Sequence, residues 1–208
     1  MCEDGVMTEA SRRLQERKRQ AVRTEIIHAA ERLFLERGYE ATTVEDIATE
    51  AGLSLRSVYR YFPTKDDLLV GRFAESLNAL IHTLATRPAT EPPWQSLQAA
   101  FDPLVQHADG QLNRDSTRRV HQAIYATPSL LGRYLQQLHD AQLSARDTLQ
   151  ARSGTTDSSA ATGDGALLAV VGSAFACFVA AQETWSHSTG STSFKTTLDQ
   201  AMAAVTPT

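Results

Sequence analysis

The 208-residue sequence has only two cysteines, Cys2 and Cys177. They form no C-x-x-C pair, and the six scattered histidines have no acidic or cysteine partners at ligand spacing, so we expect neither a disulfide framework nor a metal site. The phosphate-binding, dinucleotide-binding, nucleophile-elbow and zinc-protease motifs are also missing. These absences argue against an enzyme and predict no cofactor.

Long apolar runs are scarce as well. None opens the chain, which argues against a signal peptide or a membrane span there. The longest apolar stretch, residues 166–181, is interrupted by Gly172 and Ser173, and we interpret it as a buried helix. We therefore expect a cytoplasmic protein with no membrane contact.

Aromatic residues make up only 7% of the chain, and β-branched residues rarely cluster. Ala, Leu, Gln, Glu and Arg are plentiful, which favours an all-α fold. Helical spacing of apolar residues between turn signals predicts about nine helices. Two of them are expected at 20–37 and 94–107.

Positive charge is concentrated near the start of the chain, although the net charge is −4. Between residues 12 and 23 there are six basic side chains and one acidic side chain, Glu16, whereas the sequence from Phe73 onward is acidic. This asymmetry is typical of a protein with one local nucleic-acid-binding end. A solvated, charged helix start is the alternative.

Two short helices, expected at 44–50 and 55–61, flank a tight turn that contains Gly52. Thr43 and Ser54 are suitable N-caps for them. Burial of Ile47, Ala48 and Val58 would leave outside a polar set on the second helix: Arg56, Ser57, Arg60 and Tyr61. Such a face suits major-groove reading combined with phosphate contact.

Residues 26–69 resemble the DNA-binding domain of the TetR family of bacterial regulators. The resemblance is carried, in unbroken order, by Ala29-Ala30, Leu33-Phe34, Gly38-Tyr39, Thr42-Thr43-Val44, Ile47-Ala48, Ala51-Gly52-Leu53-Ser54, Val58 to Phe62, Lys65 and Leu68-Leu69. It implies a flexible basic leader (1–19), a three-helix helix-turn-helix domain (20–68) and a larger helical domain for ligand binding and dimerisation (69–208).

The family pattern implies roles for individual positions. Leu55, Arg56 and Ser57 would read bases, while Thr43, Tyr59, Tyr61 and Lys65 would contact phosphates. Arg60 could do either, and Tyr59 has core packing as an alternative. Arg19, in the basic leader, would add salt-sensitive, nonspecific affinity.

We call the larger helical domain (69–208) the body. For the body, the resemblance implies a homodimer through the last two helices, expected at 166–186 and 193–205. The alternative is that the first of these helices belongs only to the core of its own subunit. It also implies a pocket for a small hydrophobic or acyl-type effector, because the body is loosely similar to an acyl-CoA-like ligand-binding subgroup of the family. The candidate pocket residues, each with a structural role as its alternative, are Leu77, Phe101, His121, Gln122, Tyr125, Phe175 and Phe178.

The sequence thus predicts a ligand-responsive, sequence-specific regulator at the nucleoid, a repressor that binds a palindromic operator in double-stranded DNA as a dimer. The alternatives are an activator, a regulator without a ligand, an architectural DNA protein and an enzyme.

Overall fold

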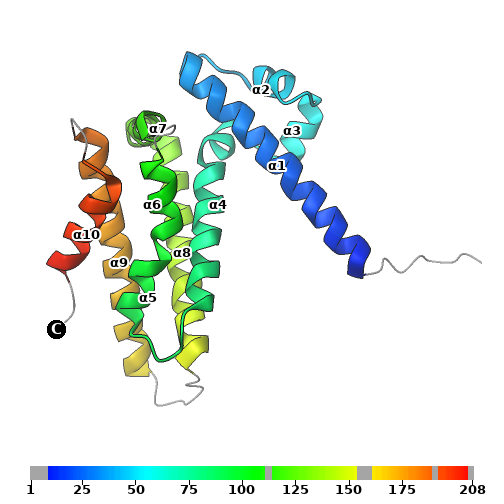
Figure 1. The fold of residues 1–208 in the computed structure, drawn as a ribbon. Coiled ribbons are helices and arrows are strands. Elements are labelled where there is room, and N and C mark those ends of the chain that lie inside the picture. Colours follow the sequence, from blue (N-terminus) through cyan, green and yellow to red (C-terminus); the bar gives the residue numbers. More distant parts are fainter. Residues whose placement is uncertain (1–8, 111–113, 154–160, 189–191, 206–208) are drawn as a thin grey trace, which may run out of the picture. The chain divides into compact units, whose positions relative to one another are not determined.

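The computed structural model describes residues 9–110, 114–153, 161–188 and 192–205 (Figure 1). These residues form ten α-helices and no strand, which confirms the all-α prediction. The helices are α1 (Glu9–Arg37), α2 (Val44–Glu50), α3 (Leu55–Tyr61), α4 (Lys65–Thr86), α5 (Pro93–Ala100), α6 (Asp102–Asp109), α7 (Arg114–Ala126), α8 (Pro128–Ser153), α9 (Ala161–His187) and α10 (Phe194–Ala204).

The chain divides into two compact units, Met1–Arg72 and Phe73–Thr208, with the division inside α4. In the first unit, α1 to α3 and the start of α4 enclose a small apolar core. Its fully buried members include Ile26, Ile27, Ile47, Val58 and Leu68. Gly38, with φ of +85°, ends α1 in the left-handed conformation that glycine adopts without steric cost.

Helix α1 begins at Glu9, eleven residues before the expected start at Gln20. The part of the predicted leader from 9 to 19 is therefore helical, and residues 1–8 lie outside the described residues. The segment contains no Gly or Pro, and most of its residues are strong helix formers. An ion pair between Glu9 and Arg13, four residues apart, supports its first turn.

The single helix expected at 94–107 is two helices. Helix α5 ends at Ala100, and α6 starts at Asp102. Pro103 explains the break, because its ring and missing N–H prevent an uninterrupted helix through this point.

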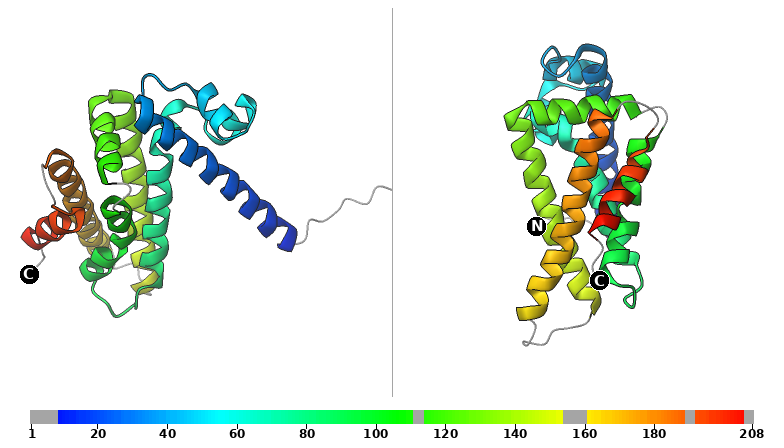
Figure 2. Two further views of the ribbon diagram at one scale, coloured as in Figure 1. Left: turned by 45° about the horizontal axis from the view of Figure 1, so that its top comes forward. Right: turned by 90° about the vertical axis from the view of Figure 1, so that its left-hand side faces the viewer.

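In the second unit, α9 packs against α5, α7, α8 and α10. Both views in Figure 2 show α10 alongside α9. The carboxylate of Asp109, at the end of α6, accepts hydrogen bonds from the backbone N–H groups of Phe194 (2.7 Å) and Lys195 (3.0 Å). This contact fixes the start of α10 on the body.

Candidate nucleic-acid interface

The turn between α2 and α3 is built around Gly52, whose φ is +65°. The N–H of Leu53 donates to the carbonyl of Ala48 at 2.9 Å, which closes the end of α2. Ile47 on α2 and Val58 on α3 are both fully buried. The turn and the burial of these two side chains together set the angle between the two helices.

Helix α3 turns its remaining residues outward. Leu55 is 40% exposed and Tyr59 46% exposed, and Arg56 and Arg60 are also exposed. The exposure of Tyr59 disfavours core packing as its main role. Ser54 caps the helix, accepting from the N–H of Ser57 at 3.2 Å, and the hydroxyls of Ser54 and Ser57 lie 2.9 Å apart. The expected base-reading residues thus occupy the first turn of a short, capped helix.

Arg60 and Tyr61 interact at the other end of α3. The Arg60 guanidinium lies 5.3 Å from the centre of the half-buried Tyr61 ring, a cation–π contact. The pair presents a phenol and a positive charge side by side. Such a surface suits a backbone phosphate better than a base edge.

Thr43 is engaged in a capping box at the start of α2. Its N–H (2.9 Å) and its hydroxyl (2.7 Å) both donate to Asp46, whose own N–H donates back to the Thr43 hydroxyl. The Thr43 hydrogen bonds lower the pKa of Asp46, so this carboxylate stays ionised at neutral pH. The donors that a phosphate would use are already occupied, and a phosphate contact at Thr43 stays a prediction that requires Asp46 to move.

Lys65 is held by a residue for which sequence reasoning assigned no role. The Lys65 ammonium lies 4.1 Å from the centre of the Tyr39 ring and donates to the carbonyl of Glu40 at 3.4 Å. Tyr39 in turn donates its hydroxyl to Asp66. Burial and the Asp66 carboxylate raise the pKa of Tyr39, which keeps the phenol protonated. This arrangement orients Lys65 at the start of α4, where a helix N-terminus also favours an anion.

Sequence and structure comparisons agree with this geometry. Residues 26–71 match the sequence model of the bacterial regulatory proteins of the tetR family. The N-terminal domain of this chain belongs to the tetR family. The resemblance seen in the sequence is therefore confirmed.

Relatives of the chain carry names consistent with this domain. The HTH-type transcriptional regulator TcmR of Streptomyces glaucescens is 32% identical over 149 residues, which are 68% of this chain and 64% of that protein. The HTH-type transcriptional repressor KstR2 of Rhodococcus jostii is 47% identical over 47 residues, 23% of either chain. This chain thus spans less than two thirds of the length of these relatives.

A solved structure has a similar fold over most of the chain. The Thermus thermophilus FadR, a TetR-family repressor in complex with lauroyl-CoA, superposes with a TM-score of 0.54 at 18% identity, covering 87% of this chain and 91% of that one. At this identity the likeness establishes the fold, including the helical body.

The body contains a polar cluster in an otherwise apolar interior. Tyr134 on α8 donates its hydroxyl to Oε1 of Gln182 on α9. Nε2 of Gln182 lies 3.4 Å from Nε2 of His121 on α7. Tyr125, one helical turn from His121, has its ring centre 6.1 Å from that of Tyr134. We call His121, Tyr125, Tyr134 and Gln182 the polar cluster.

Hydrogen bonding assigns the protonation of His121. Oε1 of Gln182 accepts from Tyr134, so the amide nitrogen of Gln182 is the atom that faces His121. Because an amide nitrogen can only donate, Nε2 of His121 accepts, and the proton of the neutral imidazole is on Nδ1. His121 is only 7% exposed, and Nδ1 has no partner among the described residues. Burial, and then the charge of His107, lower the pKa of His121 to about 4, so the ring is neutral at physiological pH.

The other predicted pocket residues are dispersed. Phe101 and Phe178 stack 5.0 Å apart, with Phe175 edge-on to Phe101, and all three are fully buried. Leu77 lies elsewhere, in a shallow groove of about 170 Å³ between α4 and α8. Gln122 is exposed and donates to the carbonyl of Ser186 at 3.0 Å, which is a structural role.

Tyr134 and Gln182 were missed by sequence reasoning. A signal existed for Tyr134, which falls on the buried stripe of α8 between Leu130 and Leu138. Gln182 is a lone amide next to the apolar run that ends at Ala181. A polar residue within an apolar helical face requires a partner, and that requirement could have paired the two.

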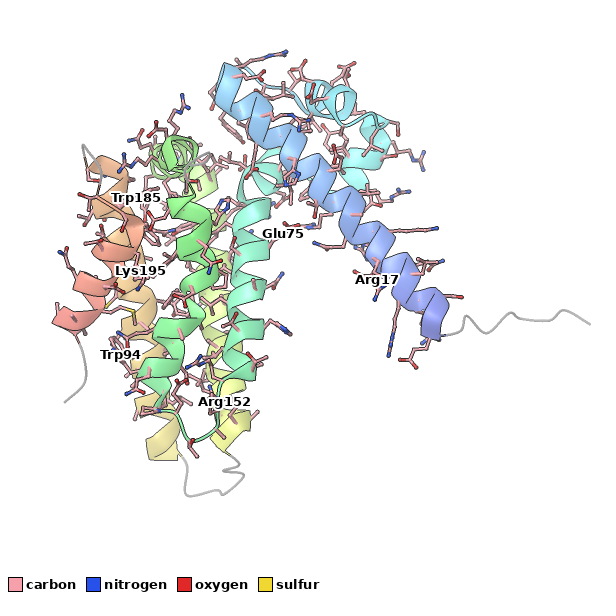
Figure 3. All side chains as sticks on the ribbon, viewed as in Figure 1. Arg17, Glu75, Trp94, Arg152, Trp185 and Lys195 are labelled. Atoms are coloured by element: carbon pink, nitrogen blue, oxygen red, sulfur yellow. The ribbon has the colours of Figure 1, made fainter. Side chains whose placement is uncertain are left out.

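Helix α9 has more apolar surface than its own body covers. Residues Gly165–His187 have the length and hydropathy of a membrane span, yet only 39% of the most apolar window is buried in this chain. Leu168 is 41% exposed, and Ala166, Ala169 and Ala176 are also exposed. Phe175, Phe178 and Trp185 of the same helix are fully buried (Trp185 is labelled in Figure 3). The outer face of α9 is therefore an uncovered apolar surface.

Proposed function

We propose that this chain is a ligand-responsive, sequence-specific transcriptional regulator, a repressor that binds a palindromic operator as a homodimer. It would act in the cytoplasm, at the nucleoid. The observation that carries the proposal is the outward face of α3, where Leu55, Arg56 and Tyr59 are exposed on a helix fixed by the turn at Gly52. The names of the relatives as regulators and repressors support the same activity.

The DNA-reading part of the proposal is tested by selecting binding sites from random duplexes and then measuring affinity by gel shift. Arg56→Ala should weaken binding to the selected site by about 1–3 kcal/mol and relax the base preference at one position. Arg119→Ala is the matched control, because it removes an exposed arginine from α7. Equal affinities of the two variants for the selected site would refute base reading by Arg56.

The dimer part of the proposal rests on the uncovered face of α9. A second copy of the chain would cover Leu168 and the exposed alanines, and small side chains permit close approach of helices. Ala176→Glu should produce monomers in light scattering, whereas Ala85→Glu, on an exposed position of α4, should not. A monomeric wild-type chain, or a dimeric Ala176→Glu variant, would contradict this interface.

The effector part of the proposal rests on the polar cluster. His121 has a neutral Nδ1–H donor with no partner among the described residues, and its buried ring is edge-on to that of Tyr134, 6.3 Å between centres. An unpaired donor among apolar neighbours suits a small hydrophobic ligand with one oxygen acceptor. An ester or ketone fits this chemistry. Acyl-CoA thioesters, such as the one bound to the Thermus thermophilus FadR, are the second candidate class.

The two classes are separated by a thermal-shift experiment with methyl laurate and lauroyl-CoA, which share an acyl chain and differ in the anionic head. We expect methyl laurate to raise the melting temperature of the wild type and to lose that effect in His121→Leu. Stabilisation by lauroyl-CoA alone would favour the acyl-CoA class. Binding of methyl laurate with unchanged affinity to His121→Leu would remove His121 from the site.

Helix α4 offers a route from effector to operator. Its Phe73 ring lies 4.7 Å from that of Tyr134, and its first residue is Lys65. A ligand that displaces Tyr134 would move Phe73, and a continuous helix carries the movement toward Lys65. The ligand would bind more tightly to the conformation in which Lys65 has moved. It would thereby favour that conformation, whose affinity for the operator is lower.

A further inference from the structure

The N-terminal part of α1 extends beyond the core of its unit as a bare helix. All residues from Ser11 to Ala21 are exposed, and the buried positions of α1 begin only at Ile26. Figure 3 labels Arg17 on this projecting part, away from α2 and α3. A helical projection of three turns whose residues are all exposed has no evident role in holding that unit together.

The basic residues of the projection are not evenly distributed around the helix. Arg12, Arg19 and Arg23 are separated by seven and four residues, so they share one face. Ile26, Ile27 and Ala30, at the next helical spacings, continue that face into the buried core. The side of α1 that packs on the rest of the unit thus becomes a row of arginines where the unit ends.

We call Arg12, Arg19 and Arg23 the arginine row. One carboxylate, Glu16, lies beside it. Arg23 anchors its inner end, with a guanidinium 4.4 Å from the centre of the Phe62 ring. Phe62 is the C-cap residue directly after α3. The row therefore starts directly beside the end of the helix proposed to read DNA.

Arg17 and Lys18 do not belong to the row. Arg17 is two residues before Arg19, roughly 200° away around the helix, and Lys18 is one residue before it, roughly 100° away. Besides Arg13, the projection thus contains two basic residues in the row, Arg12 and Arg19, and two outside it, Arg17 and Lys18. Their contributions can be measured against each other at constant net charge.

We propose that the arginine row binds the phosphate backbone of duplex DNA adjacent to the base pairs contacted by α3. This inference rests on the proposed DNA binding and extends it to a second, sequence-independent contact on a rigid helix. From Arg12 to Arg23 the helix rises about 16 Å, or roughly the length of five base pairs at 3.4 Å each. Guanidinium groups on one face, next to the recognition helix, match the charge and the linear form of such a strand.

The experiment uses the full chain and a site selected by the wild type from random duplexes. That site is prepared as a trimmed probe, limited to the protected base pairs of the α3 contact, and as a long probe with ten added base pairs on each side. The variants are Arg12→Ala/Arg19→Ala and the matched Arg17→Ala/Lys18→Ala. Every substituted side chain is exposed, so both variants should fold, and circular dichroism checks this.

We expect the wild type to bind the long probe on the order of tenfold more tightly than the trimmed probe. Arg12→Ala/Arg19→Ala should lose this advantage, with a salt slope lower by about two units per subunit. Arg17→Ala/Lys18→Ala should retain most of the advantage. Equal losses in the two variants, or an undiminished advantage in Arg12→Ala/Arg19→Ala, would overturn the arginine row.

Helical continuity is tested separately by Gln15→Pro, with Gln15→Ala as its control. Proline at this position interrupts the helix between Arg12 and Arg19 without altering charge. It should reduce the advantage of the long probe, and Gln15→Ala should not. Full binding by Gln15→Pro would overturn the rigid contact. Failure of the wild type to select any duplex would instead refute the proposed function itself.

Discussion

The turn between α2 and α3 depends on a backbone conformation that the Gly52→Ala variant tests directly. With φ of +65°, residue 52 lies in the left-handed region, where a side chain costs about 1–2 kcal/mol. A Cβ at this position would have no atom within 4 Å, so no steric clash adds to that cost. We therefore expect the whole effect to come from the backbone and to destabilise the first unit by about 1–2 kcal/mol.

The assay can separate the two units, because both tryptophans of the chain, Trp94 and Trp185, lie in the second unit. Tryptophan fluorescence follows unfolding of that unit, and circular dichroism follows both. For a first unit that comprises Met1–Arg72, each kcal/mol should lower the melting temperature by about 4–8 °C. Gly52→Ala should shift the dichroism transition of the first unit and leave the fluorescence transition in place.

Two controls define the outcome that would refute this reasoning. Gly52→Asn should cost less than Gly52→Ala, because asparagine tolerates the left-handed region. Gly132→Ala, inside α8 and with no atom within 4 Å of its added Cβ, should instead stabilise the second unit by about 0.5–1 kcal/mol. A Gly52→Ala variant as stable as the wild type, or one no less stable than Gly52→Asn, would contradict the backbone argument.

Three further predictions concern phosphate contact and the polar cluster. Lys65→Ala should weaken binding equally on all duplexes and lower the salt slope by about 0.9 per subunit, as measured by gel shift across salt concentrations; an effect on one sequence alone would exclude a phosphate role. Because the pKa of His121 falls from 6.5 unfolded to about 4 folded, the unfolded state gains protons first, so thermal stability should fall as the pH decreases from 6.5 toward 4. His121→Leu should flatten that loss, and His82→Leu, at an exposed site on α4, should not. Tyr134→Phe should destabilise the second unit by about 1–3 kcal/mol in denaturant titrations, because it leaves the buried Oε1 of Gln182 without its donor; an unchanged midpoint would refute the hydrogen bond.

Local signals allowed the helix-turn-helix to be predicted almost to the residue. The expected bounds of α2 and α3 match the structure. Thr43 and Ser54 are N-caps and Gly52 is a turn residue, and each of them acts only on the adjacent turn of the chain. The helical state of residues 9–19 was missed for the opposite reason. That segment has no apolar periodicity, and helix propensity together with the Glu9–Arg13 ion pair supports its helix.

The candidate site was less predictable than the fold. Sequence position located Thr43 and Lys65, whereas the engagement of Thr43 by Asp46 and of Lys65 by Tyr39 depends on side-chain geometry. In the body, His121 and Gln182 are 61 residues apart and meet only through the packing of α7 on α9. The residue pattern of a single helix does not reveal a contact between two helices. The predicted pocket therefore combined aromatic residues of the core, such as Phe101, with members of the polar cluster, such as His121.

Helix α9 ties the two proposed activities of the body together. Its inner side holds Gln182, which orients His121 and accepts from Tyr134, and its outer side presents the alanines proposed to meet a second copy. Ala176 and Gln182 are six residues apart, about 9 Å along the helix. A ligand that accepts from Nδ1–H of His121 would shift the imidazole ring, and with it the hydrogen bond that Gln182 donates to Nε2, so that α9 could rotate or shift within its packing. Effector binding and dimer geometry would then be linked through one rigid element, and Gln182→Leu should lower effector response and dimer affinity together rather than either one alone.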